Sequence, residues 1–305
     1  MTERPHRILI CGASGFLGSA LVPHLEGGGY EVTRLVRRAP QGEREIGWDP
    51  ASGEIDAAAL EGFDAAVNLS GESIGLGRWS TARKQRIWSS RIESTRLLCE
   101  TLARVTRKPR TLISTSAVGY YGDRGDEELD ETSSPGAGFL PRLTQLWEGA
   151  ADAARHAGIR VVHPRFGIVL ASDGGALAPM LTAFRVGLGG PIGDGRAWWS
   201  WIAIDEVVAA LEFALAAESL EGPVNFVAPG PTTNAEFART LGRVLGRPAF
   251  FAVPAFLLRA CFGEMADEAL LASARVAPRR LIQAGYVFQH PELESALRHV
   301  LGRGP

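Results

Sequence analysis

The 305-residue chain is poor in cysteine and in clustered metal ligands. Its three cysteines are odd in number and widely spaced, so neither a disulfide framework nor a zinc site of paired cysteines is expected. Its six histidines are scattered and no HExxH motif occurs, so we predict no metal site.

Strong net charge and long apolar runs are missing too. The net charge of −2 argues against a nucleic-acid groove or a polybasic membrane patch. No apolar run approaches the ~18 residues of a membrane span, and the charged start MTERPHR has no signal-peptide pattern behind it. We therefore expect a cytoplasmic protein, a monomer or homodimer with a small-molecule substrate, that binds neither nucleic acid nor membranes.

What the chain does have is a regular alternation of strand-like and helix-like segments. Apolar residues make up 46% of it, close to the usual globular share. The alternation predicts an α/β fold, with a parallel sheet covered on both faces by crossover helices. We expect strands at 7–11, 31–36, 44–48, 65–69, 111–116, 160–165 and 223–228, and helices at 16–26, 81–105, 139–156 and 207–217. Asp205 is expected to cap the last of these helices.

The second half of the chain differs in composition. Glycines cluster between residues 171 and 200, in GGALAPM and VGLGGPIGDGRAWWSW, which predicts loops and short helices. From residue 229 onward, two helical stretches surround VPAF and APRRL. We predict a larger domain of residues 1–170 and 203–228, and a smaller substrate lobe of residues 171–202 and 229–305.

The stretch HRILICGASGFLGSALVPHL joins the first expected strand to the first expected helix. In its GxxGxxG motif, Gly12 permits a tight turn, Gly15 lets a pyrophosphate approach the backbone, and Gly18 allows close packing. The N–H groups that begin the helix would point at the phosphates. A plain strand–helix turn is the alternative, but the context favours a dinucleotide. The residues predicted to hold it here are Gly12, Ser14, Gly15, Phe16, Leu17 and Gly18.

The second expected strand selects the dinucleotide. An NAD site usually ends this strand with an acid that accepts from the ribose 2′-OH, whereas EVTRLVRR ends with Arg37 and Arg38. Charge-assisted hydrogen bonds to a 2′-phosphate contribute roughly 1.5–3 kcal/mol each, enough to favour NADP over NAD by about tenfold or more. An ordinary solvated basic turn is the alternative. We predict NADP(H) as the cofactor, with Arg37 the better candidate of the two.

Three motifs in order, GASGFLG, DAAVNLSG and STSAVGYYG, resemble those of the extended short-chain dehydrogenase/reductases. More narrowly, the chain is similar to the YfcH-type epimerase family in RWSTARKQRIWSSRIEST, FRVGLGGPIGDGRAWWSWIAIDE, PVNFVAPGPTTNAEFARTLGRVLGRP and GEMADEALL. The resemblance implies an NADP(H)-binding, Rossmann-type doubly wound parallel sheet and a small C-terminal lobe that closes over a substrate cleft. It also implies that Leu69 and Ser70 lie along the cofactor and that Gly167 and Ile168 border its nicotinamide end.

The resemblance breaks at the catalytic pair. The superfamily uses a Ser or Thr with a Tyr-x-x-x-Lys pair on a following helix, and Ser116 matches the serine. On the helix FLPRLTQLWE, aligning Glu148 with the acid that usually follows the lysine places Leu140 and Thr144 at the tyrosine and lysine positions. Neither of the two lysines in the chain has a tyrosine four residues earlier.

Other residues must replace this pair if the protein is an enzyme. An unassisted tyrosine with a pKa near 10 is ionised only about one part in a thousand at pH 7. We expect Ser116 to orient the substrate oxygen and Arg91 to supply fixed positive charge near the nicotinamide. Tyr120 or Tyr121 is expected to act as the acid. The alternatives are a phosphate-binding or salt-bridging Arg91, a Ser116 hydroxyl that bonds backbone, and core packing for the tyrosines.

Two functions fit this pattern. The first is an NADP(H)-dependent oxidoreductase or epimerase acting on an unidentified small molecule, and the second is an NADP(H)-binding sensor or interaction protein with little turnover. On the substrate side, the tryptophans of GDGRAWWSWIAIDE either line a cleft or anchor the lobe. Arg185 and Arg196 could engage an anionic group such as a nucleotide-sugar diphosphate.

Overall fold

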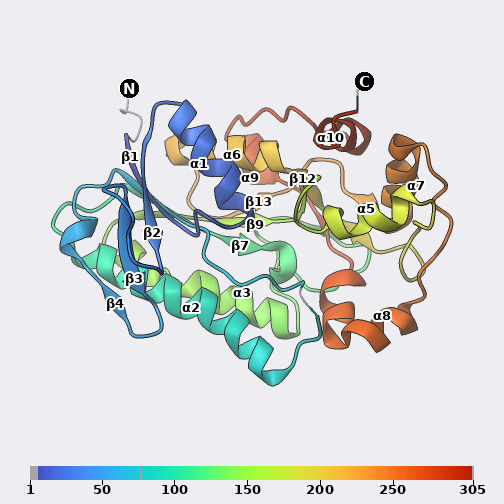
Figure 1. Cartoon of the computed structure of the whole chain (residues 1–305), viewed down its shortest axis with the longest axis horizontal. Helices are drawn as coiled ribbons and strands as arrows, with labels where there is room; N and C mark the ends of the chain where they lie inside the picture. The colour runs from blue at the N-terminus through green and yellow to red at the C-terminus, as the bar shows by residue number, and fades with distance from the viewer. Residues whose placement is uncertain (1–5, 76, 304–305) are drawn as a thin grey trace.

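The computed structural model describes residues 6–75 and 77–303. Figure 1 shows a larger α/β part on the left and a smaller lobe on the right. The larger part is built on a sheet with the strand order β13-β9-β6-β5-β1-β2-β3-β4. Its strands are β1 (Arg7–Cys11), β2 (Glu31–Val36), β3 (Glu45–Asp49), β4 (Glu54–Ile55), β5 (Ala65–Asn68), β6 (Thr111–Ser114), β9 (Arg160–Phe166) and β13 (Gly222–Phe226).

Neighbouring strands of this sheet run parallel from β13 to β3, and β4 is antiparallel to β3. The order reverses between β1 and β5, as it does in a doubly wound Rossmann sheet. A short strand, β7 (Ser116–Ala117), continues beside β9 beyond the end of β6. The expected α/β fold is therefore confirmed, and the carboxyl ends of β1, β2, β5 and β6 meet at one edge.

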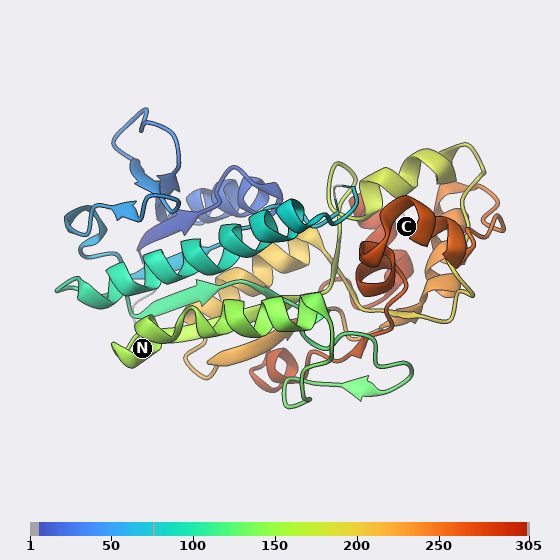
Figure 2. The same ribbon diagram turned by 90° about the horizontal axis from the view of Figure 1, so that it is seen from below.

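Helices cover both faces of the sheet. On one face lie α1 (Phe16–Gly27) and α6 (Ile204–Ala216), and on the other α2 (Thr81–Arg104), α3 (Phe139–Gly149) and α4 (Asp152–His156). Figure 2 shows α2 and α3 side by side on their face.

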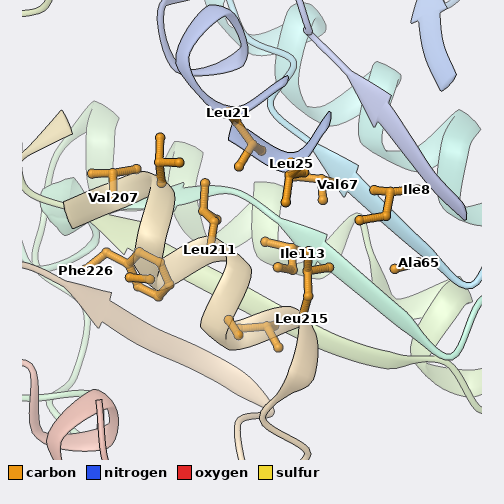
Figure 3. Close-up of a cluster of buried hydrophobic side chains, with 14 of the residues drawn as sticks. Ile8, Leu21, Leu25, Ala65, Val67, Ile113, Val207, Leu211, Leu215 and Phe226 are labelled. Atoms are coloured by element: carbon orange, nitrogen blue, oxygen red, sulfur yellow. The ribbon is translucent and has the colours of Figure 1, made fainter. Parts of the chain in front are cut away.

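Side chains of β1 point alternately to the two faces of the sheet and so contribute to both hydrophobic cores. Ile8 and Ile10 belong to the core beneath α1 and α6, and Figure 3 shows Ile8 in that cluster with Leu21 and Leu211. Leu9 points to the opposite face, where it belongs to the core beneath α2 and α4. Each large apolar side chain buried in this way stabilises the fold by roughly 1.5–3 kcal/mol.

The lobe is built from short elements around its own core. Trp201, Phe237, Leu241 and Leu297 are buried together there. The larger part also holds η1 (Ala58–Leu60), whose Leu60 belongs to the core beneath α2 and α4, and α9 (Arg279–Gln283), which lies against β13. The lobe and its connections contain η2 (Val118–Tyr120), β8 (Glu128–Leu129), β10 (Ile168–Leu170), α5 (Leu177–Arg185), β11 (Trp198–Trp199), β12 (Trp201–Ala203), β14 (Thr232–Thr233), α7 (Asn234–Leu245), α8 (Ala255–Phe262), the π-helical turn η3 (Ala266–Leu270), β15 (Arg275–Val276) and α10 (Leu293–Val300). Among the described helices, none is both long and apolar enough to cross a membrane.

Most expected elements are present within one or two residues, but three details differ. The helix expected over 139–156 divides into α3 and α4, and the strand expected over 111–116 divides into β6 and β7. Asp205 does not cap α6, because the helix begins one residue earlier, with Ala203 at its N-cap. The Asp205 carboxylate instead lies 2.6 Å from Nε2 of His299, so tertiary contact with α10 determines its place.

Candidate cofactor and catalytic site

The turn between β1 and α1 depends on the absence of side chains. Gly12 has a φ of +75°, and a Cβ built on it would lie 2.8 Å from the carbonyl carbon and oxygen of Leu69. A Cβ on Gly18 would lie 2.3 Å from the carbonyl oxygen of Gly12. Only glycines therefore allow the first turn of α1 and the end of β5 to close around this loop.

The N-terminus of α1 is left uncapped among the described side chains. Gly15 occupies the N-cap, and its N–H donates to the carbonyl of Gly12 at 3.0 Å. The first turn contains no acidic residue. The first-turn N–H groups, which belong to Phe16, Leu17 and Gly18, and the positive end of the helix dipole thus fit a bound anion.

Phe16 connects this turn to the lobe. A Cβ built on Gly174 would lie 2.5 Å from two atoms of the Phe16 ring, and one built on Gly175 would lie 3.1 Å from two others. The ring therefore lies directly on the backbone of the segment between β10 and α5. This contact joins the first turn of α1 to a glycine pair in the segment for which the composition predicted loops and short helices.

The two arginines after β2 have different surroundings. Parallel pairing sets Leu35 opposite Cys11, so Arg37 follows β2 one residue beyond the level at which Gly12 follows β1. Arg38 donates from both terminal nitrogens to the carboxylate of Glu45, at 2.8 and 2.6 Å. Arg37 makes no hydrogen bond or ion pair with the described part of the chain.

The positive charge of Arg37 influences the pKa of one nearby carboxyl group, that of Asp49. Hydrogen bonds from the N–H of Ala51 and the hydroxyl of Ser52 lower the pKa of Asp49, and Arg37 adds a smaller electrostatic contribution. Asp49 ends β3, the strand next to β2. Arg37 thus stands at the same sheet edge as the glycine turn with its hydrogen-bonding capacity unused by the described residues.

The loop after β5 is shaped by a buried amide. Asn68 accepts from the N–H of Ser70 at 3.1 Å and donates to the hydroxyl of Thr95, on α2, at 2.8 Å. The N–H of Leu69 donates to the carbonyl of Cys11 at 3.0 Å. These bonds hold Leu69 and Ser70 against the glycine turn, next to the predicted cofactor position.

Arginines of α2 fasten the next residues of that loop. Arg83 donates to the Glu72 carboxylate at 2.6 Å, and Arg91 donates to the Glu72 carbonyl at 2.9 Å with its guanidinium beneath Gly71. Burial lowers the pKa of Arg91 to about 10, and the nearby charge of Glu72 opposes this shift. The motif RWSTARKQRIWSSR thus builds a brace for the loop, in which Arg83 pairs with the Glu72 carboxylate and Arg91 bonds the backbone carbonyls of Glu72 and Ile87.

Ser116 belongs to a chain of buried polar groups. Its side chain donates to Oε1 of Glu148 at 2.7 Å, and it is 2% exposed. Glu148 also accepts two hydrogen bonds from Arg165, at 2.7 and 2.8 Å. Arg165 donates further to the hydroxyl of Tyr121 at 3.0 Å, and that hydroxyl donates to Asn225 at 2.7 Å.

The two tyrosines after Ser116 lie in different environments. Tyr121 is fully buried, and burial raises its pKa to about 12 despite the nearby charge of Arg165. Core packing and the hydrogen bond to Asn225 thus separate the Tyr121 hydroxyl from solvent, which corresponds to the packing alternative for this residue. Tyr120 is half-buried, with its ring 3.4 Å from the Arg165 guanidinium carbon.

Helix α3 presents no substitute for the tyrosine–lysine pair. Leu140 is buried against Gly119, and the hydroxyl of Thr144 donates to the carbonyl of Leu140 at 2.9 Å. The N-terminus of α3 is held by Glu268 of the lobe, whose carboxylate accepts from the N–H groups of Phe139 and Leu140 at 2.7 Å each. This contact gives the GEMADEALL segment a structural role.

The remaining candidates are spread over the lobe and its junction. Gly167 packs against Ser200, because a Cβ there would lie 2.4 Å from the Ser200 carbonyl oxygen, and Ile168 donates to that oxygen at 2.8 Å. Trp199 and Trp201 are buried and anchor the lobe, whereas Trp198 is half-buried and donates to Asp126. Arg185 and Arg196 are exposed. Within the described residues, no group of three or more potential ligands could hold a metal ion.

Comparison with known proteins agrees with this architecture. Residues 8–227 match the NAD dependent epimerase/dehydratase family. The chain belongs to this family. Residues 253–300, which contain α8 to α10, match a domain of unknown function, DUF1731.

Individual epimerase-family relatives match along the whole chain. The epimerase family protein MT2273 of Mycobacterium tuberculosis is 45% identical over 296 residues, which cover 97% of this chain and 98% of that protein. The crystal structure of human epimerase family protein SDR39U1 with NADPH is 39% identical, has a TM-score of 0.88, and is matched over 97% of this chain and 99% of that one. A nucleoside-diphosphate sugar epimerase from Corynebacterium glutamicum is 36% identical with a TM-score of 0.80, over 98% of this chain and 58% of that chain.

In this epimerase-family chain, sequence reasoning missed the groups that hold the candidate residues in place. Asn68 lies inside the motif DAAVNLSG and Glu72 directly follows it, and a polar residue ending an apolar strand was a usable signal for Asn68. Glu148 was used only as an alignment mark. Arg165 and Glu268 had no local signal, because their partners lie 17 and 128 or more residues away.

Proposed function

We propose that this epimerase-family protein is an NADP(H)-binding oxidoreductase or epimerase that acts on a small molecule. The cofactor would lie across the carboxyl ends of β1, β2 and β5, with its pyrophosphate at the first turn of α1. The observation that carries the proposal is Arg37, whose guanidinium has no hydrogen bond or ion pair to the described residues beside the glycine turn. The YfcH-type subfamily is the finer assignment that we propose.

Recognition of the 2′-phosphate would rest on Arg37 rather than Arg38. A charge-assisted hydrogen bond contributes roughly 1.5–3 kcal/mol, and about 1.4 kcal/mol is a tenfold change in affinity. Arg38 would have to release two hydrogen bonds to Glu45 before it could contribute as much. The relative solved with NADPH, human SDR39U1, supports this choice of cofactor.

NADP(H), when bound, supplies the hydride donor or acceptor, and the chain must position the substrate oxygen. Because the Ser116 hydroxyl donates to Glu148, it keeps its lone pairs to accept a hydrogen bond from a substrate hydroxyl. Arg91 would contribute fixed positive charge from beneath the loop at Gly71. Tyr120 is the remaining tyrosine for the acid, since the hydroxyl of Tyr121 is occupied and buried.

Cofactor selection can be tested with Arg37→Ala and its matched neighbour Arg38→Ala. We expect the parent protein to bind NADPH more tightly than NADH, and Arg37→Ala to lose at least about tenfold in NADPH affinity with little change for NADH. Arg38→Ala should keep most of the preference. Titration by tryptophan fluorescence and thermal shift measures both. Equal affinities for the two cofactors in the parent would contradict the proposal.

Turnover separates an enzyme from the sensor alternative. NADPH oxidation is followed with a panel of carbonyl compounds, and NADP+ reduction with the corresponding alcohols. Both Ser116→Ala and Arg91→Ala should lower the rate constant of turnover. Ser116→Ala should also keep an NADPH affinity near that of the parent. Tight NADPH binding without turnover of any compound in either direction would favour the sensor.

A further inference from the structure

The lobe exposes an unusual number of large apolar side chains. They lie in two segments near α5 and α8, and they are Val186, Leu188, Phe250, Phe251, Phe256 and Leu257. We call these six residues the apolar patch. Exposed fractions reach 69% for Phe250 and 66% for Phe256. Exposed apolar surfaces of this kind in soluble proteins usually mark a site of interaction.

The two segments that carry the patch lie side by side. The N–H of Phe251 donates to the carbonyl of Gly189 at 3.1 Å, and a Cβ on Gly187 would lie 3.4 Å from the ring of Pro248. This pairing places the segment of Val186 and Leu188 along that of the phenylalanines. The rings of Phe250 and Phe251 are 4.6 Å apart.

Helix α8 follows the phenylalanine segment in the chain and exposes several apolar residues beside Arg259, which pairs with Asp267. Phe256 and Ala260 are one turn apart and both exposed, and the same holds for Leu257 and Cys261. Leu258 is the buried residue by which the helix packs on the lobe. A surface helix normally turns polar residues to water, so the outer face of α8 has the composition of a contact surface.

Two arginines at the edge of the patch decide between possible partners. The Nε of Arg247 donates to the carbonyl of Arg185 at 3.0 Å, which joins the ends of α5 and α7. Neither guanidinium forms an ion pair with a carboxylate of the described residues. A two-fold contact with a second copy would bring this positive surface against itself, and the repulsion would oppose association.

We propose that the apolar patch docks on an anionic lipid surface. The phenylalanines and Leu257 would enter the interfacial layer, and Arg185 and Arg247 would contact lipid phosphates. The inference departs from the expectation, drawn from net charge, that the protein has no membrane partner. The net charge of the chain does not predict interfacial docking, because docking depends on where apolar and basic groups lie on the folded surface.

Vesicle co-sedimentation of the full chain with NADPH tests the docking. The parent should sediment with vesicles of phosphatidylglycerol and phosphatidylcholine in equal parts, and at least tenfold less with phosphatidylcholine alone. Phe250→Ser/Phe256→Ser should reduce binding to the anionic vesicles at least tenfold. Arg185→Gln/Arg247→Gln should reduce it about fivefold per charge, and added salt should reduce parental binding.

A control also replaces two exposed apolar residues by serine, at positions outside the patch. Ile282 and Val287 are also exposed, the latter at 82%, and neither belongs to the patch. Ile282→Ser/Val287→Ser should bind vesicles like the parent, and all variants should keep the parental melting temperature. The proposal is overturned if the parent ignores anionic vesicles, if the control loses binding as the patch variant does, or if the patch substitutions instead convert a dimer to a monomer.

Discussion

The sheet edge at Gly12 and the region around Ser116 follow two parallel strands, β1 and β6, which β5 separates, yet they are built in opposite ways. At Gly12 the chain removes side chains, leaves the helix N-terminus uncapped by the described residues and keeps Arg37 unpaired among them. Around Ser116 it fills the space with polar groups that bond one another. The first region leaves donors open to an outside ligand, whereas the polar groups of the second bond one another, and Ser116 there would meet a substrate only through its remaining lone pairs.

The largest effect is expected where the internal network is broken. Arg165→Ala leaves Glu148, whose side chain is only 14% exposed, without its charge partner, which should cost about 3–5 kcal/mol of unfolding free energy in denaturant titration. The matched variant is Arg38→Ala, which breaks the arginine–glutamate pair with Glu45. The Arg38 side chain is 50% exposed, whereas the Arg165 side chain is 3% exposed. Its midpoint should barely move. Equal losses in the two variants would show that burial does not set the strength of the Ser116 network.

A second substitution adds a side chain to the glycine turn between β1 and α1. Gly18→Ala would force a Cβ to within 2.3 Å of the Gly12 carbonyl oxygen, so the turn must shift. We expect a loss of about 1–3 kcal/mol in stability and of most NADPH binding by titration. Gly27→Ala, on the same helix with open space around its Cβ position, should be as stable as the parent or more so. Unimpaired NADPH affinity in Gly18→Ala would mean that the turn is not the phosphate site.

A third variant loosens the lobe from the larger domain. Glu268→Ala removes the only acceptor that the described residues offer to the first N–H groups of α3, since Gly138 has no side chain to cap with. Loss of a helix cap costs about 1–2 kcal/mol, and hydrogen exchange at Phe139 and Leu140 should accelerate. Glu264→Ala, which breaks an exposed pair with Lys84, is the control and should leave those amides protected.

The smallest expected effect is a pH dependence of stability that arises from His163, a buried residue of β9. Burial lowers the pKa of His163, although Glu148 opposes the shift, and its ring lies 3.1 Å from the carbonyl of Ser114. Below the ordinary histidine pKa of about 6.5 the unfolded chain takes up a proton that the folded chain refuses, so stability falls as pH decreases. Denaturant titrations at pH 7.5 and 5.5 should show a smaller fall in His163→Gln than in the parent. An identical fall would contradict this assignment.

Local patterns were enough for the elements and for the cofactor edge. The strands around Ile8, Val67 and Ile113 and the helices between them follow from periodicity, and the glycine turn follows from three glycines at a strand–helix junction. The catalytic residues could not be predicted in the same way. The environment of Tyr121 depends on its hydrogen bonds with Asn225 and Arg165. These two residues lie on β13 and β9, and only the folded sheet brings them next to Tyr121.

By itself, the amino-acid sequence determined the parallel sheet, the position of the phosphate-type turn and the missing tyrosine–lysine pair, because these depend on residues close together along the chain. The tertiary structure alone decided that Arg38 is occupied while Arg37 has no partner among the described residues, that Ser116 donates to Glu148, and that Phe256 and Leu257 of α8 face outward. Pairing of charges and exposure of a face depend on neighbours from distant segments, and only folding brings those neighbours together.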